Sequence, residues 1–360
     1  MAELPVEGRV AKCIRTHLVG SLPFVDARDA MKESLERLGA TLPHVPDGET
    51  GERKDFILHL GNRMVQNPQL KARRTMLRFF GMHESVYRFI VRPEGNLEFP
   101  LGQLGYHSDW VAGLDLFREL REKCGRPELR YQMSVATPLS IAGIYFRTPR
   151  NIRRALGPMR EGLRAEIAAA VETDRKSLVI QLDAPGEQAF VAITQRFAPP
   201  FARAVARRMA RQLAVLATDV PHDVPLGIHL CLGNANNRRG ITPRTARPVV
   251  LLANECAAAF AGVRPLDFLH IPLVNTSNPR HFAPLADLRL AKSTRLIAGL
   301  VYEDGHGANR DRLRLAAEAL GFIPDVACAC GMGRRTPDVA RLLLDELHSL
   351  ANSSEPEAAA

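Results

Sequence analysis

Two residues with metal-binding side chains, His229 and Cys231, are two positions apart in the apolar run 227–233. In a β-strand, side chains two positions apart point to the same face, so the imidazole and the thiol can converge. Zinc sites are typically built from imidazole and thiolate ligands. Another cysteine, Cys330, ends a second apolar run near the C-terminus. The three residues predict a zinc site if the fold brings both runs together; the alternative is a buried histidine and buried structural thiols.

The length and composition of the chain are those of a globular protein with one large core. It has 360 residues, of which 46% are hydrophobic and 24% charged, and these fractions are ordinary for a folded domain. No apolar run approaches the roughly 18 residues that span a bilayer, and the acidic start, broken by Pro5, is unlike a secretory signal. We expect a cytoplasmic protein with no membrane partner. The six scattered cysteines do not indicate a disulfide framework.

The formal net charge of +9 is compatible with nucleic acid or with an anionic small molecule as a partner. Many arginines, such as those in 203–211, are spaced as the solvated face of a helix beside an apolar stripe. The chain contains no helix-turn-helix or zinc-finger pattern, and it has one tryptophan and five tyrosines. We therefore expect a small-molecule substrate, which can be anionic, and no nucleic-acid partner.

Eight apolar, strand-like runs alternate with helical patterns along the chain. Eight βα units predict an α/β fold, a (β/α)8 TIM barrel formed as a single domain by residues 1–350. Short, almost wholly apolar runs are typical of strands buried on both faces. A doubly wound open sheet is the alternative, but no Gly-x-Gly-x-x-Gly follows the first run. The runs are 13–21, 42–46, 130–136, 177–183, 227–233, 267–274, 294–301 and 325–330.

Two further segments depart from this alternation. Residues 86–91 and 96–99 flank a Pro-Glu-Gly turn, which predicts a β-hairpin inserted at about residues 85–110, after the second βα unit. The polar, proline-containing residues 351–360 predict a disordered tail.

Polar residues collect where the predicted strands end. Active sites of (β/α)8 barrels lie at the C-terminal ends of the strands, and burying many carboxylates there without a ligand would be costly. The sequence therefore predicts one site at that end of the barrel. The residues at these strand ends or just beyond them include Ser21, Asp47, Glu49, Asp183, His229, Cys231, Glu303, Asp304, His306 and Cys330.

These pieces together resemble the catalytic barrel of cobalamin-independent methionine synthase, in the superfamily that also contains uroporphyrinogen decarboxylase. The resemblance extends over nearly the whole chain. In chain order the matching motifs are Val-Gly-Ser-Leu-Pro at 19–23, Gly-Glu at 48–49, Ile-Gln-Leu-Asp-Ala-Pro at 180–185, His-Leu-Cys at 229–231, Val-Tyr at 301–302 leading to His306, and Cys-Gly-Met at 330–332.

The resemblance implies zinc-dependent transfer of a methyl group to a thiol. It makes His229, Cys231 and Cys330 zinc ligands. A second set of residues would bind and process the substrate: Ser21, Glu49 and Asp183 at positions that hold the carboxylate and amine of an amino acid, and His306 one residue from the family's proton-donating histidine. Asp183 and His306 are thus the expected catalytic residues.

The chain departs from the family pattern at two positions. Pro272 stands where the family has a glutamate ligand at the end of the sixth strand, and Ala184 replaces a glutamate after Asp183. His270, two residues before Pro272 on the same strand face, is a candidate fourth ligand; water or substrate is the alternative. The differences favour transfer of a methyl or other alkyl group to a thiol, as in single-barrel relatives, over methionine synthesis itself.

Arginines near the predicted strand ends bear on the identity of the substrate. Arg15 and Arg53, together with Arg334 and Arg335, could bind a sulfonate, phosphate or carboxylate, or pair with acidic residues at the rim. The expected partners are a small-molecule thiol and an alkyl donor. Two other functions stay open: a metal-free lyase or decarboxylase of the same superfamily, and a non-catalytic barrel that binds a small molecule.

Overall fold

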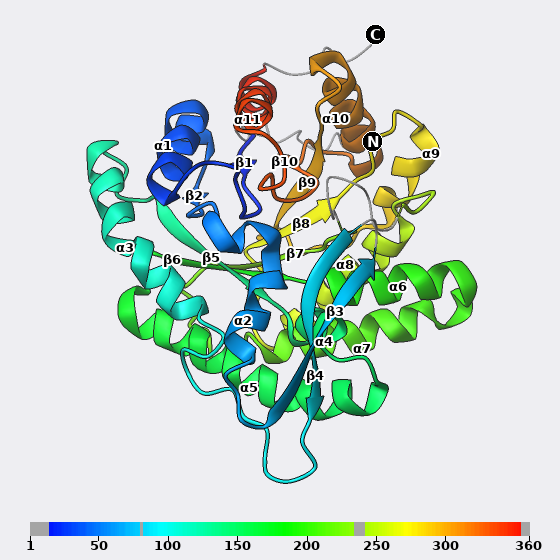
Figure 1. Cartoon of the computed structure of the whole chain (residues 1–360). Coiled ribbons are helices and arrows are strands. Elements are labelled where there is room, and N and C mark those ends of the chain that lie inside the picture. The colour runs from blue at the N-terminus through cyan, green and yellow to red at the C-terminus, as the bar shows by residue number, and fades with distance from the viewer. Residues whose placement is uncertain (1–13, 80–81, 234–241, 354–360) are drawn as a thin grey trace.

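A computed structural model describes residues 14–79, 82–233 and 242–353. Eight parallel strands form a nearly closed barrel in the order β1-β10-β9-β8-β7-β6-β5-β2, surrounded by helices (Figure 1). The predicted (β/α)8 fold is confirmed. The strands are β1 (Thr16–His17), β2 (His44–Val45), β5 (Arg130–Ala136), β6 (Leu178–Asp183), β7 (Leu226–His229), β8 (Phe268–Pro272), β9 (Arg295–Val301) and β10 (Asp325–Cys328).

The sheet of the barrel is interrupted between β1 and β2, which are the first and last strands of its hydrogen-bonded order. Both strands have two residues, and within the described ranges no strand pairing joins them. The loops that follow them are joined instead, since the amide of Leu22 donates to the carbonyl of Gly48 over 2.7 Å. This bond draws the two strand ends together at the mouth where the polar residues gather.

Helices cover the outside of the barrel. Several begin at a Thr or Asp whose side chain accepts a hydrogen bond from the first turn, as at Asp26, Thr137, Thr148 and Thr336, which satisfies otherwise unpaired amides. The helices are α1 (Ala27–Leu38), α2 (Leu60–Met64), α3 (Tyr106–Lys123), α4 (Pro138–Tyr145), α5 (Pro149–Asp174), α6 (Pro185–Phe197), α7 (Ala202–Val215), α8 (Arg247–Ala261), α9 (Pro279–Phe282), α10 (His306–Leu320) and α11 (Pro337–Asn352).

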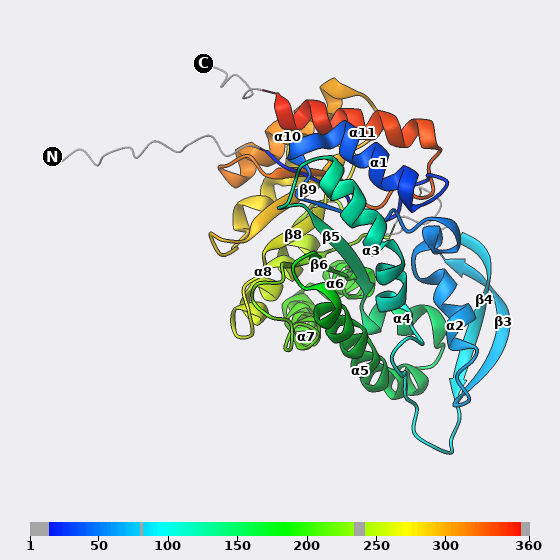
Figure 2. The ribbon, with the colours of Figure 1, turned by 90° about the vertical axis from the view of Figure 1, so that its left-hand side faces the viewer.

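The inserted hairpin exists, but earlier in the chain than predicted. β3 (Leu70–Phe79) pairs antiparallel with β4 (Met82–Val91), and residues 96–99 form no strand. Leu97 and Phe99 are buried, so their apolar alternation packs a loop on the core. The sequence of β3 gives no clear alternation of apolar and polar residues, because arginines interrupt it. The hairpin stands with α2 at one side of the barrel (Figure 2).

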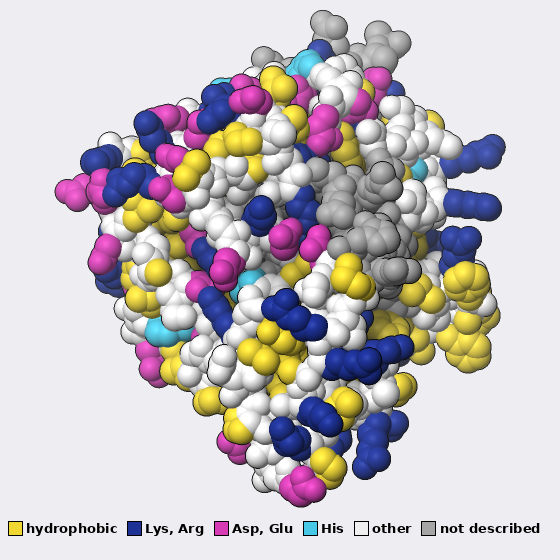
Figure 3. All heavy atoms as spheres, in the orientation of Figure 1, with side chains coloured by type: hydrophobic (Ala, Val, Ile, Leu, Met, Phe, Trp, Pro, Cys, Tyr) yellow, Lys and Arg dark blue, Asp and Glu magenta, His cyan; other side chains and the backbone are white. Residues whose placement is uncertain are grey.

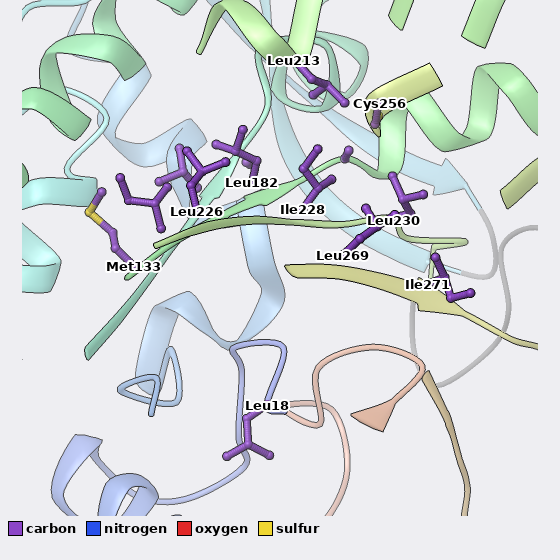
Figure 4. Close-up of a cluster of buried hydrophobic side chains, with 14 of the residues drawn as sticks. Leu18, Met133, Leu182, Leu213, Leu226, Ile228, Leu230, Cys256, Leu269 and Ile271 are labelled. Atoms are coloured by element: carbon purple, nitrogen blue, oxygen red, sulfur yellow. The ribbon is translucent and has the colours of Figure 1, made fainter. Parts of the chain in front are cut away.

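Side chains along β7 alternate between the outer core and the barrel interior. Leu226, Ile228 and Leu230 lie toward Leu213 of α7 and Cys256 of α8 (Figure 4). The intervening residues of β7 therefore face inward, where Gly227 makes room for a neighbour: a Cβ on this glycine would lie 2.3 Å from the Phe268 ring. The same alternation directs His229 and Cys231 inward.

Helix α11 extends into the segment that the sequence predicts to be a disordered C-terminal tail. This helix ends at Asn352, within the predicted tail 351–360, and residues 354–360 lie outside the described ranges. Among the helices of the described ranges, none combines the length and the apolar character needed to cross a bilayer.

Candidate metal centre

Three residues from two separate strands converge at the mouth of the barrel. His229 ends β7 and Cys231 follows it, while Cys330 comes two residues after β10. Their potential ligand atoms all lie within 4.8 Å of one another, and the two sulfur atoms are 3.6 Å apart. Strands β8 and β9 separate β7 from β10 in the sheet, so curvature of the barrel is what brings these side chains together.

The hydrogen bonds of His270 determine which nitrogen of His229 is available to a metal. His270 Nε2 lies 3.0 Å from the carbonyl oxygen of Cys328, which can only accept, so Nε2 donates. Burial, and next to it the charge of His229, lowers the pKa of His270, which is therefore neutral. Its Nδ1 accepts from His229 Nδ1 over 2.7 Å. His229 Nε2 is left with its lone pair, buried and without a hydrogen-bond partner.

His270 therefore does not take the predicted part of a fourth ligand. Both of its ring nitrogens are engaged, one by His229 and one by Cys328, because β8 pairs with β7 in a register that places His270 beside His229. A hydrogen-bond partner that fixes the ring orientation of a metal-binding histidine is a common feature of zinc sites. The donor set and the unpartnered Nε2 thus fit a zinc ion held by His229, Cys231 and Cys330.

The two thiols are arranged to share one proton. The hydrogen bond from Cys231 holds the pKa of the Cys330 thiol below its usual range. The same bond, together with burial, raises the pKa of Cys231. The amide of Gly233 donates to the Cys231 sulfur over 3.3 Å. Of the two sulfur atoms, that of Cys330 is therefore the one favoured as a thiolate.

Glu49 is held beside the cluster in an unusual backbone conformation. Its φ of 44° lies in the left-handed region, which costs energy for any residue with a Cβ, and its amide donates to Asp47. The carboxyl packs on Gly20, where a Cβ would lie 2.8 Å from Glu49 Oε1. Burial, and secondarily Asp47, raises the pKa of Glu49 to about 8. At neutral pH this carboxyl is therefore largely protonated and can donate a hydrogen bond.

Asp183 and Ser21 complete the polar wall. Asp183 ends β6 and accepts from the side-chain amide of Gln181 over 2.9 Å; burial, and next Glu49, raises its pKa. Ser21 lies against the loop after β10, where a Cβ on Gly331 would be 2.4 Å from its Oγ. Ser21, Glu49 and Asp183 all line one cavity of about 460 Å³ together with His229, Cys231 and Cys330.

No protein-family model and no curated protein sequence matches this chain. Its fold is that of B12-independent methionine synthases. A B12-independent methionine synthase from a Shewanella species, solved in complex with selenomethionine, superposes with a TM-score of 0.62 at 14% identity, over 95% of this chain and 97% of the other. A putative vitamin-B12 independent methionine synthase from Listeria monocytogenes gives 0.56 at 13% identity, over 96% and 98%.

Two residues expected at the site lie elsewhere on this methionine synthase-like barrel. Arg15 precedes β1, so it lies at the opposite end of the barrel, where its amide donates to Asp325. His306 begins α10, is 42% exposed, and pairs with Glu346 of α11 over 3.0 Å. The structure thus places neither residue at the cavity, and the predictions of substrate binding for Arg15 and of catalysis for His306 are corrected.

Arg53 is close to the site but neutralised. It pairs with Asp47, and its Nε lies 3.9 Å from Asp109. These groups line a separate, small cavity of about 40 Å³ that also borders Glu49. Arg53 therefore orders the acidic groups behind Glu49 and does not line the large cavity.

The sequence did not single out a set of polar side chains inside the barrel. His17 and His44 face each other with ring centroids 5.2 Å apart. Neither ring nitrogen of His17 has a hydrogen-bond partner, although the residue is buried, and His44 bonds to Gln132 over 2.9 Å. The available signal was a histidine within each of two apolar runs, 13–21 and 42–46, where a TIM barrel usually has aliphatic residues.

Proposed function

We propose that this chain is a zinc-dependent enzyme that transfers a methyl or other alkyl group to the thiol of a small molecule. The observation that carries the proposal is the convergence of His229, Cys231 and Cys330, whose potential ligand atoms lie within 4.8 Å of one another, while His229 Nε2 has no hydrogen-bond partner. A buried, unpaired imidazole nitrogen beside two thiols is costly unless a ligand occupies the site. The likeness to B12-independent methionine synthases, at 14% identity, supports the fold in which this chemistry is proposed.

The chemistry follows from the donor set and the wall beside it. Zinc held by His229, Cys231 and Cys330 would lower the pKa of a substrate thiol, making it a nucleophile at neutral pH. In the transfer, a bond forms between the substrate sulfur and the alkyl carbon. The bond from that carbon to the rest of the donor breaks, the electron pair leaves with the donor, and the thiol proton is released to it or to solvent.

The neighbouring carboxyl groups would orient the thiol substrate. Glu49, protonated at neutral pH because of its raised pKa, can donate a hydrogen bond to a substrate carboxylate. Asp183 is anchored by Gln181, and an ammonium group bound next to it would favour its ionised form. Ser21 adds a hydroxyl on the same wall. An amino-acid-like thiol, such as one related to the selenomethionine bound by the Shewanella enzyme, fits these three groups.

Metal analysis tests the proposal. Protein purified without chelator is expected to hold about one zinc per chain, and Cys231→Ser and Cys330→Ser are expected to lose it. Cys124→Ser is the matched control, because Cys124 is exposed and outside the cluster. Zinc near zero in the wild-type protein would overturn the proposal. Turnover that resists chelators and survives Cys330→Ser would instead favour a metal-free lyase or decarboxylase.

A further inference from the structure

The cavity at the metal centre has two chemically different parts. Its volume of about 460 Å³ lies within the roughly 300–1,000 Å³ typical of small-molecule sites. Most of its polar groups come from the strand ends described above, and Asp55, Arg88 and Arg334 add charged groups at other points of the wall. The rest of its wall is mostly apolar. It comes mainly from helix α4, through Leu139, Gly143 and Ile144, and from helix α6, through Ala189, Phe190 and Ile193.

Helix α4 is built to present an apolar surface on more than one side. Ile141, Ala142 and Tyr145 are buried in the protein core, while Leu139 and Ile144 line the cavity. A helix that is apolar all round is normally buried on all sides. Here one side faces the cavity, and Gly143 adds space there, since a Cβ at this position would meet no atom within 4 Å.

On helix α6 the apolar wall of the cavity continues to the protein surface. Phe190 and Ile193 line the cavity, yet each is 51% exposed. Hydrophobic side chains gather at the right-hand edge of Figure 3, where α6 lies in Figure 1. Large apolar side chains exposed beside a cavity are typical of a ligand site, so the opening is itself apolar.

The charged groups of this part of the cavity are few and largely engaged. Arg334 Nε lies 3.4 Å from Asp55 Oδ1, so these two charges compensate each other. The guanidinium of Arg88 donates to the carbonyl of Ile144. A ligand with several charges would lose its hydration against a mostly apolar wall that offers few charged side chains to replace it.

We propose that the alkyl donor of this enzyme has an uncharged, apolar body, which binds between α4 and α6 while the thiol substrate occupies the polar strand ends. This inference rests on the proposed function for the role of the ligand, and on the cavity wall for its chemistry. Specificity for the donor is then set by α4 and α6, far from the zinc ligands in sequence, with Gly143 and Ala189 determining the available space.

Binding of an uncharged fluorophore tests this inference. We expect the zinc-loaded full chain to bind N-phenyl-1-naphthylamine saturably, at about one molecule per chain. Gly143→Leu is expected to weaken binding at least about tenfold, because the new side chain occupies the cavity. Gly157→Leu is the matched control, since Gly157 also has open space around it, lies in helix α5, and does not line the cavity.

A second cavity-filling variant covers the case in which Gly143→Leu fails to fold, as judged by circular dichroism. Ala189→Leu, in α6, also adds volume to the wall and is expected to weaken probe binding. Absence of saturable binding, or equal binding by the cavity-filling and control variants, would overturn the inference. So would equally tight binding of the sulfonated probe 8-anilinonaphthalene-1-sulfonate, since it would remove the preference for an uncharged body.

The zinc-ligand variants separate this inference from the proposed function. Cys330→Ser is expected to change affinity for the uncharged probe by no more than about twofold, because the apolar wall is distinct from the metal ligands. Zinc binding without probe binding would overturn only the donor inference. Probe binding by a wild-type protein that holds no zinc would overturn the proposed function and leave an apolar ligand site.

Discussion

His270 Nδ1 lies 2.7 Å from His229 Nδ1, and this single hydrogen bond determines which nitrogen of His229 faces the two thiols. The bond depends on the register between β7 and β8 and on the carbonyl of Cys328, which orients His270 from its other side. His270 is thus a positioning residue, connected to the proposed metal centre through a ligand.

Replacing His270 tests this relationship. We expect His270→Ala to bind zinc about 10 to 100 times more weakly, the usual effect of losing the partner that orients a ligand histidine, while saturating zinc restores full occupancy. Competition with a coloured chelator measures the affinity. His306→Ala serves as control, because His306 contacts Glu346 on the surface. Loss of zinc stoichiometry at saturation would instead make His270 a ligand.

A methyl group on Gly20 tests how Glu49 is held. The added Cβ would lie 2.8 Å from Glu49 Oε1, so Gly20→Ala should displace the carboxyl and weaken binding of an amino-acid thiol, while overpacking costs about 1–3 kcal/mol of stability. Zinc content should stay unchanged. Calorimetric titration with homocysteine compares Gly20→Ala with Gly307→Ala, a control whose Cβ meets no atom within 4 Å. Equal affinity in both would show that Gly20 does not restrict Glu49.

Strand periodicity made most of the barrel predictable, because strands buried on both faces have a clear apolar signal. The signal failed for β1 and β2, which have two residues each in place of the longer runs 13–21 and 42–46. At the seam, apolar residues pack as loops with few strand partners. The hairpin was predicted too late in the chain for a related reason: Leu97 and Phe99 are buried without being in a strand.

At the site, the convergence of Cys231 and Cys330 could be predicted because both follow strands. Arg15 was placed at the wrong end because the predicted run 13–21 includes it, whereas β1 begins at Thr16 and Arg15 precedes it. The role of His270 in orienting His229 could not be predicted either. It depends on interstrand register and on ring orientation, neither of which residue spacing determines.

A buried arginine should stabilise the loop between β9 and α10. Arg312 is 1% exposed and donates to both carboxylate oxygens of Asp304, at 2.8 and 2.6 Å, and to the carbonyl of Leu300. Arg312→Met would leave these acceptors without their donor, and we expect a loss of about 1–3 kcal/mol in the free energy of unfolding. Urea denaturation measures it. Arg314→Met, which breaks an exposed pair with Glu318, should cost about 0–1 kcal/mol; equal losses would contradict the prediction.

Glu49 should make stability depend on pH in a window that its raised pKa defines. Burial, and secondarily Asp47, raises this pKa from 4.5 to about 8, so the folded protein keeps the proton after the unfolded chain has lost it. Below about pH 4.5 both states are protonated and the stabilising contribution is complete. As pH rises toward 8 it declines, by a few kcal/mol in total, and above 8 it is gone.

Urea unfolding of chelator-treated wild-type and Glu49→Gln protein, at intervals from pH 4.5 to 9, isolates this contribution. The free energy of unfolding of the wild type relative to the variant should fall across the window, since glutamine does not titrate. Asp29→Asn is a control on an exposed carboxyl at the start of α1, and it should not change the wild-type profile. A difference between wild type and Glu49→Gln that stays constant with pH would mean that Glu49 is ionised in the folded protein. The carboxyl would then be unable to donate a hydrogen bond to the substrate.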